Sequence, residues 1–108
     1  MNSSRREKIE ALLEEEPSDP FLRYSLAMEL DKEANHPASL SLLAGLQRDP
    51  KPYVPSFFMA AQQLARLDRL EEARSALRDG IAEARRQGDA HAAAEMSEFL
   101  MSLGRQNE

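Results

Sequence analysis

The sequence contains no cysteine, and this absence excludes disulfide bonds and thiolate metal sites from the 108-residue chain. The lack of cysteine fits a reducing compartment, so we expect a cytoplasmic location. No apolar run is long enough to cross a membrane, and the basic start of the chain is not followed by the apolar block of a signal peptide. The net charge is −5, so we expect neither nucleic acid nor a membrane surface among the partners.

Motifs that carry catalysis are also absent from the sequence. There is no Gly-x-Ser-x-Gly elbow and no glycine-rich loop that would cradle a phosphate. The two histidines, His36 and His91, are far apart in the chain, and neither has a carboxylate at metal-ligand spacing along a helix. We therefore predict no enzymatic activity, no metal and no cofactor.

Instead, the middle of the chain repeats itself at a fixed distance. One series of residue pairs is separated by 34 positions: Tyr24 and Phe58, Leu26 and Ala60, Ala27 and Ala61, Leu30 and Leu64. A second series is separated by 35 positions: Ala38 and Ala73, Leu42 and Leu77, Gly45 and Gly80, Leu46 and Ile81. A period of this length is typical of a helical solenoid, in which units stack on their neighbours and present a surface.

Helix start and stop signals divide the chain into six segments. Ser4 and Glu7 form a capping box at the first helix. Asp68 with Glu71 is expected to cap the fifth helix, and Asp89 the sixth. The other boundaries are expected at Pro17, Asp19-Pro20, Asn35 to Pro37, Pro55 and Gly88. No segment shows the alternation of a strand.

The repeated residues resemble the tetratricopeptide repeat (TPR) family, whose unit is a helix A, a short turn and a helix B. The second unit carries the closer match, in the residues Phe57, Ala60, Ala61, Leu64, Asp68 to Ala73, Leu77 and Gly80. The first unit matches at Leu26-Ala27, Leu30, Ala38, Leu42, Gly45 and Asp49-Pro50. It departs where Arg23 replaces a large apolar residue, and its turn at Glu33 to Pro37 is expected to be one residue short.

The resemblance implies an all-α fold, a TPR-like helical-hairpin solenoid of about six antiparallel helices. We expect one domain over residues 1–108. Within it we expect an N-terminal B-like helix at 3–16, the first repeat at 19–50, the second repeat at 53–87 and a C-terminal capping helix at 89–104.

In the TPR family the A helices line a concave groove in which peptides usually bind. The groove positions fall on Phe21, Tyr24, Met28, Asp31, Lys32, Phe58, Gln62 and Arg66. The resemblance therefore implies a protein–protein interaction module, a TPR-type adaptor or scaffold that binds a peptide or an amphipathic helix of another protein. The alternative is a structural unit whose apolar groove is buried in a homodimer.

Two surfaces leave a choice open. Phe21, Tyr24 and Met28 form a stripe separate from the leucines of the same helix, and this stripe is either a contact surface or part of the core. Arginines on the fifth helix, such as Arg74, Arg78 and Arg85, either dock an acidic segment or a phosphate backbone, or they pair with neighbouring glutamates at helical spacing. For the arginines we favour the second interpretation.

Overall fold

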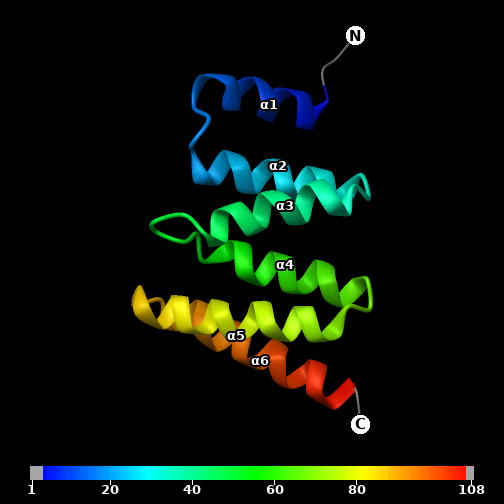
Figure 1. Cartoon of the computed structure of the whole chain (residues 1–108), viewed down its shortest axis with the longest axis vertical. Coiled ribbons are helices and arrows are strands. Elements are labelled where there is room, and N and C mark those ends of the chain that lie inside the picture. Colours follow the sequence, from blue (N-terminus) through cyan, green and yellow to red (C-terminus); the bar gives the residue numbers. More distant parts are fainter. Residues whose placement is uncertain (1–3, 107–108) are drawn as a thin grey trace. The chain divides into compact units, whose positions relative to one another are not determined.

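The computed structural model describes the backbone of residues 4–106 and the side chains of residues 4–104. This part of the chain contains no strand and is built from helices: α1 (Arg5–Glu15), α2 (Pro20–Lys32), α3 (His36–Gln47), α4 (Pro55–Arg66), α5 (Leu70–Arg86) and α6 (Ala90–Gln106) (Figure 1). The all-α fold predicted from the sequence is confirmed. Residue 3, the expected start of the first helical segment, and the expected domain ends at 1 and 108 lie outside the described residues.

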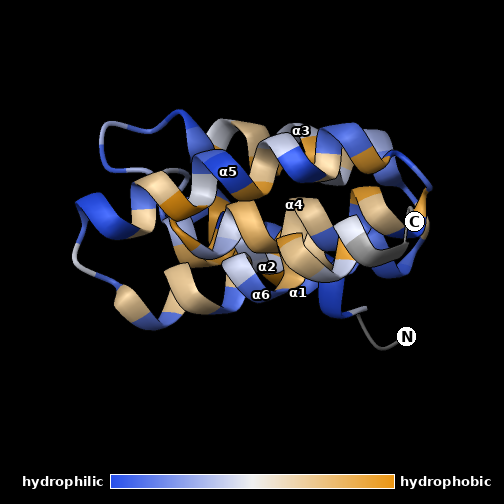
Figure 2. Ribbon diagram, turned by 90° about the horizontal axis from the view of Figure 1, so that it is seen from below, coloured by the Kyte–Doolittle hydropathy of each residue, from blue (hydrophilic) through white to orange (hydrophobic). Residues whose placement is uncertain are grey.

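The chain divides into two compact units, Met1–Lys51 and Pro52–Glu108. In the first unit α2 packs against both α1 and α3, and in the second unit α5 packs against both α4 and α6. Each unit therefore contains one helical hairpin, α2–α3 or α4–α5, together with one further helix. Hydrophobic residues recur as orange bands along α5 and α6, as expected for helices with one buried face (Figure 2).

Side-chain caps begin most of the helices where the sequence predicted them. Ser4 and Glu7 form the reciprocal capping box of α1, and Glu7 N donates to Ser4 Oγ at 3.1 Å. Asp19 accepts from Leu22 N at 2.9 Å, and Asp89 accepts from Ala92 N at 3.0 Å. These bonds satisfy backbone N–H groups that have no partner within the helix.

The predicted cap at Asp68 is wrong. Asp68 lies one residue too early, since Arg69 occupies the N-cap position of α5 and makes no side-chain cap bond. Asp68 instead adopts a left-handed backbone with φ of 61°, which ends α4. Its N–H donates to the carbonyl of Ala65 at 3.0 Å, and the N–H of Arg69 donates to Leu64 O at 2.9 Å. Asp68 therefore closes the preceding helix and does not start the next one.

The same turn recurs in the chain with different residues. Ala34 between α2 and α3 has φ of 62°, and Gly88 between α5 and α6 has φ of 78°. The N–H of the following residue again bonds back to the helix, from Asn35 to Leu30 O at 2.8 Å and from Asp89 to Ala84 O at 2.8 Å. The turns 33–35 and 67–69 are equally long, so the expectation of a shorter first turn is wrong.

Equal turns place the B helices, α3 and α5, at an offset of 34 residues and correct the predicted offset of 35. The N-cap residues Asn35 and Arg69 are 34 apart. Buried residues follow the same spacing: Ser39 and Ala73, Leu43 and Leu77, Leu46 and Gly80. Gly45 is therefore not the counterpart of Gly80, although both are glycines.

The equivalent positions Leu46 and Gly80 are packed differently in the two units. In the second unit Gly80 is buried, and a Cβ built on it would lie 2.5 Å from Phe57 Cβ and 2.6 Å from Met96 Sδ. This glycine lets α4 and α6 approach α5 closely. In the first unit Leu46 stands at that position, and Arg23 stands 34 residues before Phe57.

Arg23 is held by a bidentate ion pair instead of an apolar neighbour. Its Nη1 and Nη2 donate to the two carboxylate oxygens of Asp49 at 2.7 Å and 3.1 Å, and both side chains are partly buried. Because Asp49 follows the end of α3, this pair joins the start of α2 to the end of α3. Arg23, which departs from the TPR pattern, is thus accommodated by its ion pair with Asp49.

Candidate functional site

The predicted groove residues of the first unit lie on α2 in two different environments. The side chain of Phe21 is 64% exposed, while Tyr24 and Met28 are half-buried. Asp31 contacts Nδ1 of His36 at 3.3 Å, and Lys32 Nζ lies 3.6 Å from Glu29. Asp31 and Lys32 therefore take part in contacts inside the unit, and Phe21 is the most exposed apolar side chain of the five.

The predicted groove residues of the second unit lie on α4, where α6 completes a cavity. Gln62 and Arg66 are exposed and line an open pocket of about 520 Å³ together with Ala65 of α4 and Phe99 and Leu103 of α6. Phe58 packs edge-to-face on Phe99, with ring centroids 5.7 Å apart and planes at 67°. The structure thus brings Phe58, Gln62 and Arg66 to one side of the second unit.

Sequence reasoning missed the contribution of α6 to this pocket. The sequence predicts only a capping helix at 89–104, and it gives Phe99 and Leu103 no role in a site. In the sequence α5 separates α4 from α6, so the pattern does not show that residues of α4 and α6 line one pocket. The spacing of Phe99 and Leu103, one helical turn apart, marks the α6 face that contacts α4.

Two of the four arginines of α5, Arg74 and Arg86, pair with glutamates of the same helix, and so does the N-cap residue Arg69. Arg74 bonds Glu71, and Arg69 Nη2 lies 2.6 Å from Glu72. Arg86 Nη2 lies 2.6 Å from Glu83, and this hydrogen bond, followed by one from Gln87, lowers the pKa of the Glu83 carboxyl. Of the three arginines named from the sequence, pairing with a neighbouring glutamate is therefore confirmed for Arg74, and for Arg78 and Arg85 it stays a prediction.

No cluster of three or more histidine, aspartate or glutamate side chains suited to a metal occurs among the described residues. His91 Nε2 lies 3.4 Å from a carboxylate oxygen of Glu95, four residues further along α6, so the expectation that neither histidine has a carboxylate at ligand spacing along a helix is wrong for His91. Within residues 4–106 no helix has the length and apolar character that a membrane span requires.

Solved structures resemble both the fold and the sequence. A tetratricopeptide repeat domain protein from Salinibacter ruber, solved by NMR, is 32% identical over 81% of this chain and 88% of its own, with a TM-score of 0.74. A crystal structure of the Salinibacter ruber tetratricopeptide repeat domain protein is 31% identical over 81% of this chain and 97% of its own, with a TM-score of 0.70. No protein-family model and no curated protein sequence matches the chain.

The chain therefore belongs to the tetratricopeptide repeat family. A third structure, a protein from Bordetella parapertussis, is 27% identical, covers 98% of this chain and 92% of its own, and has a TM-score of 0.81. The TPR-like helical-hairpin fold predicted from the repeats is thus confirmed. This fold is typical of non-enzymatic modules that contact other proteins.

Proposed function

We propose that this chain is a TPR-type adaptor that binds a peptide segment or an amphipathic helix of another protein through its A helices. The observation that carries the proposal is the pocket between α4 and α6. A volume of about 520 Å³ falls in the range of ordinary ligand pockets, so the space suits one or two side chains of a partner segment.

The chemistry of the pocket favours a mixed ligand. Phe99 and Leu103 offer an apolar floor, whereas Gln62 and Arg66 offer an amide and a guanidinium. A partner segment that places an apolar side chain on Phe99 and a carboxylate or carbonyl near Arg66 satisfies both parts of the lining. On α2, the exposed ring of Phe21 supplies a separate apolar contact.

The first test compares variants of exposed residues, because these changes leave the core intact. Arg66→Glu with Gln62→Ala alters the rim of the pocket, and Phe21→Ser removes the exposed ring. Met101→Ser is the matched control, since Met101 is 58% exposed on α6 and does not line the pocket. Partners captured by the wild-type protein from the native host are purified and titrated against each variant by calorimetry.

The expected result is at least a tenfold rise in Kd for Arg66→Glu with Gln62→Ala, and an unchanged Kd for Met101→Ser. Equal affinity of all variants for every purified partner contradicts the proposal. Phe58→Ala is a poor probe of binding because the ring of Phe58 packs on Phe99, so its loss also affects stability.

A homodimer is the second candidate, and the exposure of Phe21 favours it. Sedimentation equilibrium over a hundredfold range of concentration separates the two. A tight dimer that Phe21→Ser converts to a monomer supports self-association, whereas a monomer at all concentrations supports the adaptor.

A further inference from the structure

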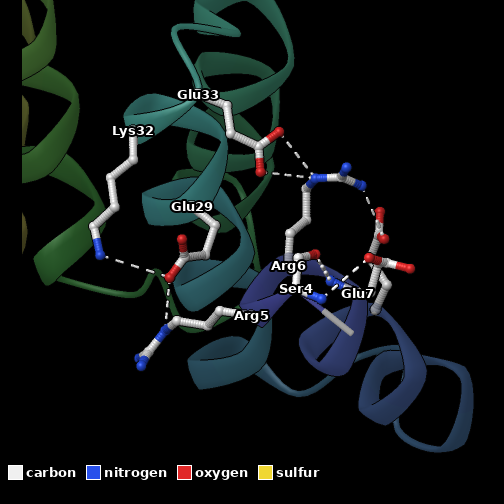
Figure 3. Close-up of polar contacts among 8 residues, drawn as sticks. Ser4, Arg5, Arg6, Glu7, Glu29, Lys32 and Glu33 are labelled. Atoms are coloured by element: carbon white, nitrogen blue, oxygen red, sulfur yellow. Dashed lines mark hydrogen bonds and ion pairs between the residues drawn. The ribbon is translucent and has the colours of Figure 1, made fainter. Parts of the chain in front are cut away.

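Two arginines at the start of the first helix, α1, form ion pairs with glutamates at the C-terminal end of α2. Arg5 Nε lies 2.6 Å from Glu29 Oε1, and Arg6 Nε lies 3.0 Å and 2.9 Å from the two carboxylate oxygens of Glu33 (Figure 3). Arg6 also pairs with Glu10 of its own helix at 3.1 Å. The hydrogen bond to Glu33 raises the pKa of the Arg6 guanidinium. These contacts depend on charge and weaken in high salt.

The apolar contribution of α1 is small. Ile9 is the one buried residue of this helix, Leu13 is half-buried and Leu12 is 51% exposed. The helix ends in acidic residues, and its last turn has no basic side chain, so the helix dipole is opposed and not balanced. An eleven-residue helix with these properties has little intrinsic stability and depends on its contacts with α2.

Beneath α1 lies a defined surface of α2. The side chain of Glu29 is only 11% exposed, so undocking of α1 brings a covered carboxylate into contact with water. Leu22, Leu26 and Glu29 of α2 and its C-cap residue Glu33 follow one another at helical spacing and share one face. By the same spacing, this face differs from the stripe of Phe21, Tyr24 and Met28. We call these four residues the acidic face of α2.

We propose that α1 is a reversible cover of the acidic face, and that an amphipathic helix of a partner protein with two adjacent basic residues in its first turn binds this face when α1 leaves. The pattern of α1 itself defines the partner. Two adjacent basic residues correspond to Arg5 and Arg6, and apolar residues follow at the spacing of Ile9 and Leu13. Two carboxylates on α2 complement the two cations. This site lies outside the proposed groove, so the α1 cover and the groove can be tested independently of each other.

Hydrogen exchange on the full chain tests the cover. In Arg5→Ala with Arg6→Ala, amides of α1 should lose at least tenfold in protection while those of α5 stay unchanged. Alanine is the better helix former, so lower propensity does not explain such a loss. Arg69→Ala with Arg86→Ala is the control, since it removes ion pairs within the second unit. Equal protection of α1 in all three proteins, at low salt and in 1 M salt, overturns the proposal.

A labelled peptide copying residues 4–16 tests the exposed face. Fluorescence anisotropy should show at least tenfold tighter binding to Arg5→Ala with Arg6→Ala than to the wild type, whose own α1 competes. A matched peptide with glutamate in place of both arginines should not bind. Glu29→Gln with Glu33→Gln on the protein should release α1 yet fail to capture the peptide.

Equal binding of the two peptides, no binding to the arginine variant, or equal binding to the variant and the wild type each overturns the proposal. Concentration-dependent dimerisation confined to the arginine variant assigns the face to a second copy of the chain and overturns the partner helix.

Discussion

Replacing Gly80 by alanine tests the close packing of the second unit. The added Cβ would lie 2.5 Å from Phe57 Cβ and 2.6 Å from Met96 Sδ. Carbon atoms in contact normally stay about 3.5–4.0 Å apart, so the neighbours must move by about 1 Å. Phe57 Cβ is fixed to the backbone of α4, and moving it requires α4 to shift as a whole.

The net effect combines two opposing terms. Overpacking a filled core costs about 1–3 kcal/mol, and replacing a mid-helix glycine by alanine stabilises by about 0.5–1 kcal/mol. We expect Gly80→Ala to lower the free energy of unfolding by about 1–2 kcal/mol. For a chain of this size the Tm should fall by about 5–10 °C.

Gly45→Ala is the matched control in the first unit. Its Cβ would meet only Arg23 Nη2, at 3.4 Å, which is the distance of an ordinary contact. This variant should be more stable than the wild type by about 0.5–1 kcal/mol because the helical term acts alone. Urea denaturation followed by far-UV circular dichroism measures both variants. Equal stability of Gly80→Ala and Gly45→Ala would refute the packing argument.

Three further predictions follow from the turns, the Arg23 pair and the first helix. Ala34→Gly should raise the free energy of unfolding by about 1 kcal/mol, and Gly88→Ala should lower it by about 1 kcal/mol, because a left-handed backbone strains any residue with a Cβ. Urea denaturation of both variants checks this, and changes of equal sign contradict it. Asp49→Asn should lower the free energy of unfolding by about 1–2 kcal/mol, because it leaves the half-buried Arg23 without its anion. In a double-mutant cycle with Arg23→Met, the loss of stability in the double variant should be smaller than the sum of the two single losses. Strict additivity contradicts the ion pair. The backbone N–H of Ser4, helped by its side chain, lowers the pKa of the Glu7 carboxyl from its ordinary value. The stabilisation of α1 is therefore present above the unfolded pKa and is lost as the pH falls through the folded pKa. NMR titration of Glu7 should show Ser4→Ala moving the pKa partly back, and an unchanged pKa contradicts the capping contribution.

The candidate site could be predicted only in part. Helical period and the TPR pattern predicted Phe58, Gln62 and Arg66 as groove residues. Gln62 and Arg66 line the pocket, and Phe58 packs on Phe99, which is another of its lining residues. The same reasoning gave Asp31 and Lys32 equal weight, yet their side chains contact His36 and Glu29. Position on a helix face is set by local geometry, whereas the choice of partner depends on which charged groups the next element brings near.

The sequence by itself determined the helices and the family. Prolines, Gly88 and the caps at Ser4, Asp19 and Asp89 fix helix ends because each acts on backbone groups within a few residues. The 34-residue period of the A helices, α2 and α4, arises because the same pattern of apolar residues occurs in both helices. Such features need no knowledge of distant parts of the chain.

Tertiary structure decided how the repeats correspond and what covers α2. Matching Gly45 with Gly80 by identity gave the wrong offset, because burial, and not residue type, defines an equivalent position: Leu46 and Gly80 occupy it with side chains of different size. Phe57 and Met96 fill the space over Gly80, while Arg23 is held by Asp49. Packing depends on the side-chain volumes and charges that several helices bring together, so the sequence of one helix does not determine it.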